Sequence, residues 1–96
     1  MGNSKDTLAY FLQRLGNTSR ISSRYESGEC KILVDGKEVA LIADDLLYIP
    51  VCPESASLEN LCEKDIPYLG AKYHYIIGEA QIGSIHNVAK ILISMV

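Results

Sequence analysis

The side chains that could bind a metal ion in this sequence are three cysteines and two histidines, namely Cys30, Cys52, Cys62, His74 and His86. No two of them form a Cys-x-x-Cys or His-x-x-x-His pair, the spacings that place two ligands on one turn or one helix face. Structural cysteines and surface histidines are the simpler interpretation. We therefore expect no metal and no other cofactor.

A Cys–His pair for nucleophilic catalysis could form only through the fold, and its candidates are Cys52 and His74. The sequence contains no Gly-x-Ser-x-Gly, Gly-x-Gly-x-x-Gly or P-loop motif. The adjacent carboxylates Asp44 and Asp45 favour a turn, and a turn is too exposed for general-acid catalysis. The prediction is a non-enzymatic protein. The alternative is a small enzyme or ligand-binding domain that uses Cys52 and His74.

The composition is that of a folded and mildly acidic domain. Its 96 residues are 48% hydrophobic and carry a net charge of −3, which suits one modest core and gives no attraction to nucleic acid. No apolar run reaches the roughly 20 residues of a membrane helix, and the polar N-terminus does not resemble a signal peptide. Three widely spaced cysteines favour a reducing compartment. We expect a cytoplasmic protein without membrane contact or direct DNA binding.

Three short apolar runs separated by turn signals predict an antiparallel meander of three strands over residues 30–34, 39–43 and 46–51. Asp35-Gly36 marks the first turn, because a tight hairpin turn needs the positive φ that glycine adopts without steric cost. Asp44-Asp45 marks the second turn. Alternation places three residues of the first run on one face, namely Cys30, Ile32 and Val34.

Helices and further strands flank the meander. The other predicted elements are a helix over residues 4–15, a strand over 20–26, a helix over 53–64, two short strands within 68–77 around Gly70-Ala71, and a last helix that begins at Gly83-Ser84. The chain is thus predicted to be one domain over residues 1–96 with an α+β fold. Its antiparallel sheet has five or six strands and its helices pack on one face, in the order α-β-β-β-β-α-β-β-α.

The end of the chain is apolar on all sides of the predicted last helix. A helix with one solvated face would not show this pattern, so these side chains contact a second copy or the chain is a piece of a longer protein. We favour the first interpretation and expect a homodimer. The residues of this predicted dimer surface are Ile91, Ile93, Met95 and Val96.

Arginines and tyrosines are the other residues that could form a binding surface. Arg20 and Arg24 share one face of a predicted strand, where a solvated sheet edge explains them better than an anion site. Four tyrosines lie on strands that we expect to be neighbours: Tyr48, Tyr68, Tyr73 and Tyr75. Filling of the sheet face is favoured over a docking surface, although tyrosine is enriched at interfaces.

A further pattern runs through the meander and the strand that follows it. It consists of Arg24, Gly28, Val34-Asp35-Gly36, Ala40-Leu41-Ile42 and Leu47-Tyr48-Ile49, followed by His74-Tyr75 and Gly78-Glu79. In these residues and in the order of its elements, from about Leu8 to Met95, the chain resembles the N-terminal domain of the TfoX (Sxy) family of bacterial competence regulators. Arg24 and Gly28 are what the chain retains of the family's glycine-rich run, and Pro50 stands where the family usually has Arg or Lys.

The resemblance implies a regulatory protein-interaction module, without the helical C-terminal domain that full-length regulators carry. Full-length members are similar to transcription coactivators that work with the cyclic-AMP receptor protein at promoters of DNA-uptake genes, largely through protein contacts. We therefore expect protein partners, with the transcription machinery as a candidate. The predicted partner surface joins Arg20, Arg24 and Tyr25 to a neighbouring strand end at Tyr48 and Pro50. A chaperone-like adaptor that holds a partner on the open sheet face is a further alternative.

Overall fold

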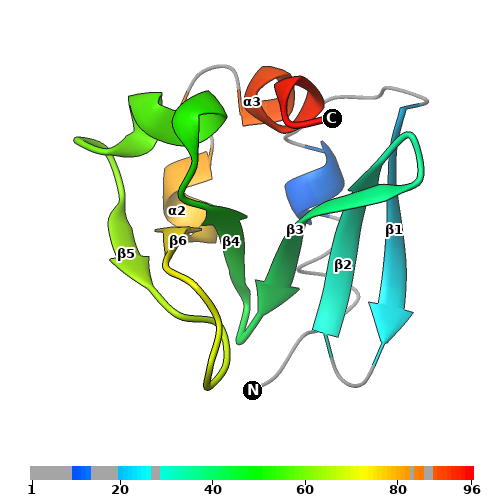
Figure 1. Cartoon of the computed structure of the whole chain (residues 1–96), viewed down its shortest axis with the longest axis horizontal. Coiled ribbons are helices and arrows are strands. Elements are labelled where there is room, and N and C mark those ends of the chain that lie inside the picture. The colour runs from blue at the N-terminus through cyan, green and yellow to red at the C-terminus, as the bar shows by residue number, and fades with distance from the viewer. Residues whose placement is uncertain (1–9, 14–19, 27–28, 83, 86–87) are drawn as a thin grey trace.

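A computed structural model describes residues 10–13, 20–26, 29–82, 84–85 and 88–96 of the chain. Its centre is one antiparallel sheet of six strands, whose order across the sheet is β1-β2-β3-β4-β6-β5 (Figure 1). The strands are β1 (Ile21–Glu26), β2 (Glu29–Val34), β3 (Lys37–Ala43), β4 (Leu46–Pro50), β5 (Glu63–Asp65) and β6 (His74–Ile77). The predicted α+β fold with an antiparallel sheet of five or six strands is confirmed.

Both turns of the predicted meander adopt the left-handed backbone that tight hairpins need. In the β2–β3 turn, Asp35 has a φ of 53° and Gly36 a φ of 82°, as the Asp-Gly pair predicted. The β3–β4 turn has the same conformation without glycine, since φ is 50° at Asp44 and 61° at Asp45. Aspartate is tolerated there because its short polar side chain can hydrogen-bond the local backbone.

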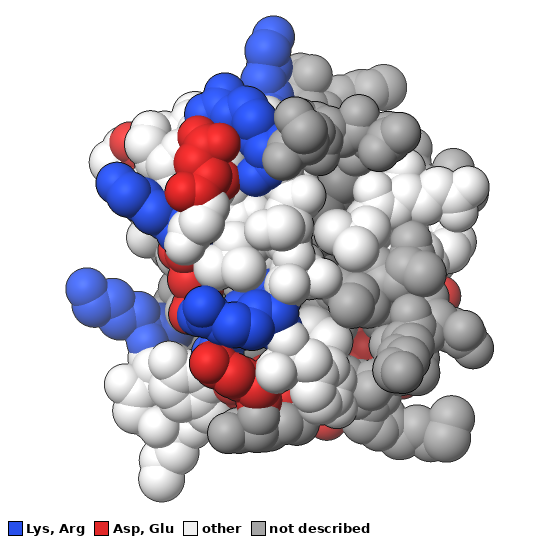
Figure 2. Space-filling view, turned by 90° about the vertical axis from the view of Figure 1, so that its right-hand side faces the viewer, with Lys and Arg blue, Asp and Glu red and all other residues white. Residues whose placement is uncertain are grey.

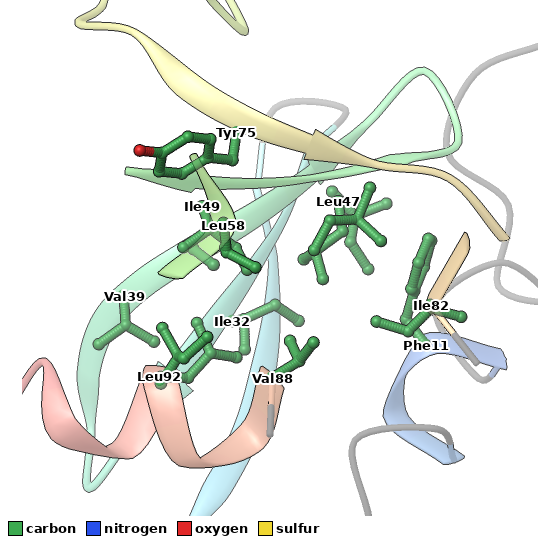
Figure 3. Close-up of a cluster of buried hydrophobic side chains, with 14 of the residues drawn as sticks. Phe11, Ile32, Val39, Leu47, Ile49, Leu58, Tyr75, Ile82, Val88 and Leu92 are labelled. Atoms are coloured by element: carbon green, nitrogen blue, oxygen red, sulfur yellow. The ribbon is translucent and has the colours of Figure 1, made fainter. Parts of the chain in front are cut away.

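The described helical segments all contribute to one core against one face of the sheet (Figures 1 and 3). Tyr10–Gln13 are helical, and the Tyr10 hydroxyl donates to the Glu79 carbonyl at 3.2 Å. The helices contribute Phe11, Leu58, Ile82, Val88, Ile91 and Leu92. The sheet contributes Cys30, Ile32, Val34, Val39, Ala40, Ile42, Leu47, Ile49, Tyr75 and Ile77. The face that alternation predicted for β2 is therefore the core face.

The segment after β4 differs from the predicted helix over residues 53–64. It forms a 3-10 helix, η1 (Pro53–Leu58), and then the edge strand β5. The Ser55 hydroxyl accepts from the Cys52 backbone N–H at 3.0 Å and donates to the Pro50 carbonyl at 2.7 Å, which holds η1 against the end of β4. Pairing with β6 then provides hydrogen-bond partners for the backbone of β5. Residues 63–65 therefore form a strand and not the last turn of the predicted helix.

The remaining elements also differ in their boundaries. Residues 68–71 form a turn instead of the first of two predicted strands. The last predicted helix includes α3 (Val88–Ser94), and a further short helix that was not predicted, α2 (Glu79–Ile82), lies before its predicted start. Most of the predicted helix over residues 4–15, and the predicted start of the last helix at Gly83, lie outside the described residues.

Candidate functional site

Three of the five residues predicted to bind a partner lie at the β1 edge of the sheet. Arg20 precedes β1 and forms an ion pair with Asp35 at 2.7 Å, which raises the pKa of Arg20 and lowers that of Asp35. Within β1, the Arg24 Nε lies 3.3 Å from a carboxylate oxygen of Glu26. Tyr25 is 57% exposed. Figure 2 views the molecule from this side, where positive and negative side chains are interspersed.

The other two residues of that predicted surface, Tyr48 and Pro50, lie in β4. The strands β2 and β3 separate β4 from β1, so the predicted adjacency is wrong. Tyr48 is also buried, with 6% of its surface exposed, and its ring packs edge-on against the His74 ring at a centroid distance of 6.4 Å. Burial raises the pKa of Tyr48, and the negative charges of Asp44 and Asp65 add to the effect. Tyr48 is therefore a core residue and not part of a contact surface.

The face of the sheet opposite the helices has its own small apolar cluster. Leu41, Ala43 and Tyr48 are buried there, with Leu46 and Ile76 packed against them. Beside it, the ammonium group of Lys31 lies 3.3 Å from Glu29 and 3.5 Å from Glu38. Burial opposes the charged form of Lys31, but the two carboxylates outweigh it and raise its pKa. The centre of this face therefore does not offer the exposed apolar area that a chaperone-like adaptor would use.

The apolar C-terminal residues pack mainly on the core of their own chain. Ile91 is 8% exposed and belongs to the core cluster, and Ile93 and Met95 are partly buried against it. Val96 keeps 44% of its surface exposed. Ile91 is thus a core residue, whereas Ile93, Met95 and Val96 keep part of their surface exposed, and the predicted dimer surface stays a prediction.

The four tyrosines expected on neighbouring strands divide into two pairs. Tyr48 and Tyr75 are buried on opposite faces of the sheet. Tyr68 and Tyr73 are 52% and 64% exposed. Burial in the core raises the pKa of Tyr75. Of these four tyrosines, Tyr68 and Tyr73 are therefore the two that can contribute to a docking surface.

The exposed pair belongs to the β5–β6 loop, which comprises residues 66–73. A backbone hydrogen bond of 3.1 Å from the Ala71 N–H to the Tyr68 carbonyl closes a turn in it, and Gly70 has a φ of 90°. These values are typical of a type II turn, whose second position projects outward. Leu69 occupies that position and is 97% exposed. Gly70 is the sequence signal for this turn, whereas the expectation from the sequence is a boundary between two strands at Gly70-Ala71.

The end of β4 adds one more exposed apolar side chain to this region. The Val51 N–H donates to the Tyr73 carbonyl at 3.2 Å, and Val51 is 42% exposed. The loop residue Ile66 is 36% exposed, and its N–H donates to a carboxylate oxygen of Asp65 at 2.7 Å. We call Val51, Ile66, Tyr68, Leu69 and Tyr73 the apolar loop surface. A group of exposed large apolar side chains of this kind is typical of a protein-binding site.

Cys52 and His74, the pair considered for nucleophilic catalysis, each contact a different neighbouring residue. The Cys52 sulfur lies 3.5 Å from the Ser55 hydroxyl oxygen. His74 is 9% exposed, and its Nδ1 donates to the Lys72 carbonyl at 2.8 Å. No contact between Cys52 and His74 is observed within the described part of the chain. Each side chain thus has a local hydrogen-bond partner.

The described residues contain no group of three or more His, Cys, Asp or Glu side chains that could hold a metal ion. His86, the second histidine considered for this role, lies outside the described residues. The three cysteines are free thiols, and burial raises the pKa of Cys30 and of Cys62. Within the same described ranges, no helix is long and apolar enough to cross a membrane.

Comparison with protein-family models, with curated proteins and with solved structures found no match to this chain.

Proposed function

We propose that this protein is a non-enzymatic protein-interaction module with a regulatory role. The observation that carries the proposal is the apolar loop surface, and above all Leu69, whose side chain is 97% exposed at the tip of a turn. A solvated turn is usually built from polar residues, glycine and proline. A large apolar side chain at its tip contributes little to folding but can insert into a pocket of a partner.

The resemblance to the N-terminal domain of the TfoX (Sxy) family supports a particular class of partner for this module. The proposed partners are proteins of the transcription machinery, and the net charge of −3 favours protein contacts over direct binding to DNA. Three free thiols suit a reducing cytoplasm, which we propose as the compartment. The rigid sheet and the short β5 and β6 strands would present the loop in one orientation, which reduces the entropic cost of binding.

The test is affinity capture from the native cell with the wild type and two leucine variants. Leu69→Asp places a charge on the most exposed side chain of the apolar loop surface, and we expect recovery of a specific partner to fall by about tenfold or more. Leu61→Asp is the matched control, because Leu61 is also exposed, at 58%, but lies outside that surface. Circular dichroism should show that both variants fold, since neither side chain is buried.

Equal recovery of the same partners by the wild type and by Leu69→Asp would refute the proposed surface. If the recovery of one partner depends on Leu69, the identity of that partner then tests the regulatory part of the proposed function. A transcription factor or a polymerase subunit would support that part, and a metabolic enzyme as the sole Leu69-dependent partner would contradict it.

A further inference from the structure

The backbone of the edge strand β1 offers hydrogen-bonding groups at alternate residues. The Asp35 N–H donates to the Arg20 carbonyl at 2.9 Å, and this pair continues the β1–β2 register, in which Ile21 faces Val34. Bonded and non-bonded pairs alternate along an antiparallel ladder. The even-numbered residues from 20 to 26 therefore bond to β2. The residues whose N–H and C=O groups point away from the sheet are Ile21, Ser23 and Tyr25.

We propose that this edge binds a second copy of the chain, with the two β1 strands antiparallel about a two-fold axis at Ser23. In that register Ile21 faces Tyr25 of the second copy, and Ser23 faces Ser23 of the second copy. All three outward-facing residues then meet outward-facing residues, so the two edges can exchange about six backbone hydrogen bonds. The two sheets would become one continuous sheet.

The charges along β1 favour this register over the two neighbouring registers, with axes at Ser22 and at Arg24. It places Arg20 opposite Glu26 of the second copy, twice, and Arg24 opposite Ser22. These are non-hydrogen-bonded pairs, in which facing side chains are closest. Moving the axis to Ser22 would place Arg20 opposite Arg24, and moving it to Arg24 would place the two Arg24 side chains opposite each other. Like charges directly opposite destabilise a strand pair, so both shifts are disfavoured.

The apolar side chains of β1 support the same arrangement. Tyr25 is 57% exposed on the edge, whereas Ile21 is partly buried against the core cluster. Pairing would place each Tyr25 ring beside Ile21 of the second copy and so cover an exposed aromatic side chain at the margin of the core. The side chains of Ser22 to Glu26 are all exposed, which leaves room for the second strand.

The β1 edge and the apolar loop surface lie at opposite ends of the strand order, because β6 and β5 end the sheet on the other side. Self-association through β1 would therefore leave both loop surfaces free. A dimer with two such surfaces could bind a partner with two sites more tightly than a monomer could. The proposal does not depend on the proposed function, since Leu69→Asp should leave the dimer intact.

The first test is light scattering behind size exclusion, over a concentration series, with complementary charge variants. In the variant Arg20→Glu, the new carboxylate would lie opposite the carboxylate of Glu26 of the second copy. In the variant Glu26→Arg, the new guanidinium group would lie opposite the guanidinium group of Arg20 of the second copy. We expect either change to raise the dimer Kd by about tenfold or more, because each interface contains the pair twice. An equimolar mixture of the two variants should regain a dimer of near wild-type affinity, because both pairs are again of opposite charge.

A wild type that stays monomeric throughout the series would overturn the proposal. So would single variants that dimerise as the wild type does, or a mixture that associates no better than its components. Recovery in the mixture also shows that both variants are folded.

The second test acts on the backbone at the proposed axis. Ser23→Pro removes an N–H that points away from β2, so the intrachain ladder keeps its hydrogen bonds, as proline at an edge strand allows. The dimer should be lost with little change in Tm, whereas Ser23→Ala, which retains the N–H, should still dimerise. Dimerisation of Ser23→Pro would rule out pairing through this edge.

Discussion

Truncation of Leu92 to alanine tests whether the C-terminal helix belongs to the core of its own chain. Leu92 is fully buried in α3, and Figure 3 shows it directed with Val88 toward Ile32 of the sheet. Substitution of a buried leucine by alanine usually lowers the free energy of unfolding by about 3 to 5 kcal/mol, since the apolar contact is lost and a cavity remains. A domain of this size has a total of only about 5 to 14 kcal/mol. Leu92→Ala should therefore remove a large part of its stability.

The assay is urea unfolding followed by circular dichroism, together with thermal unfolding. At about 4 to 8 °C for each kcal/mol, Leu92→Ala should lower the Tm by at least about 12 °C. Val96→Ala is the control near the same terminus, and because Val96 is 44% exposed its effect should stay within about 0.5 kcal/mol. If Leu92→Ala instead changed the oligomeric mass and left the free energy of unfolding of the monomer unaltered, α3 would be an assembly surface and the assignment to the core would be refuted.

Three further predictions concern single buried or turn residues. Gly36→Ala should lower the free energy of unfolding by about 1 kcal/mol in urea titrations, because an L residue is strained at a φ of 82° although the added Cβ meets no atom within 4 Å. Asp35→Asn should be less stable than the wild type at neutral pH. Its difference from the wild type should vanish as the pH falls through the native-state pKa of Asp35, which Arg20 lowers below the unfolded-state value. Tyr75→Phe should unfold at the same or a slightly higher urea concentration, because the described residues supply no hydrogen-bond partner to this buried hydroxyl.

Each of these three has a control or a contrary outcome. Gly78→Ala is the matched control for Gly36, since its φ lies outside the left-handed region and an added Cβ would make only ordinary contacts of 3.6 and 3.7 Å. A pH-independent difference for Asp35→Asn would exclude the ion pair as its cause, since asparagine also tolerates the positive φ. A loss of about 1 kcal/mol or more in Tyr75→Phe would show that the hydroxyl has a favourable partner.

Local features of the sequence determined the meander. The Asp35-Gly36 pair specifies its own turn through backbone sterics, and period-2 alternation assigns Cys30 and Ile32 to the core whatever covers them. The fold class followed from the same local patterns, because an antiparallel sheet with one apolar face needs helices to cover that face.

The candidate surfaces depended on contacts between residues far apart in the chain, which no local pattern contains. Tyr48 is buried because β6 and the opposite-face cluster lie beside it, and Ile91 is buried because α3 returns to the sheet. The β5 strand forms only because β6 offers a free edge, and this pairing leaves Leu69 at the tip of an exposed turn. Residue types and spacing by themselves determined the hairpins of the meander, the core face of β2 and the class of fold. Only the tertiary structure decided which apolar side chains face water, because exposure depends on what the rest of the chain packs against each residue.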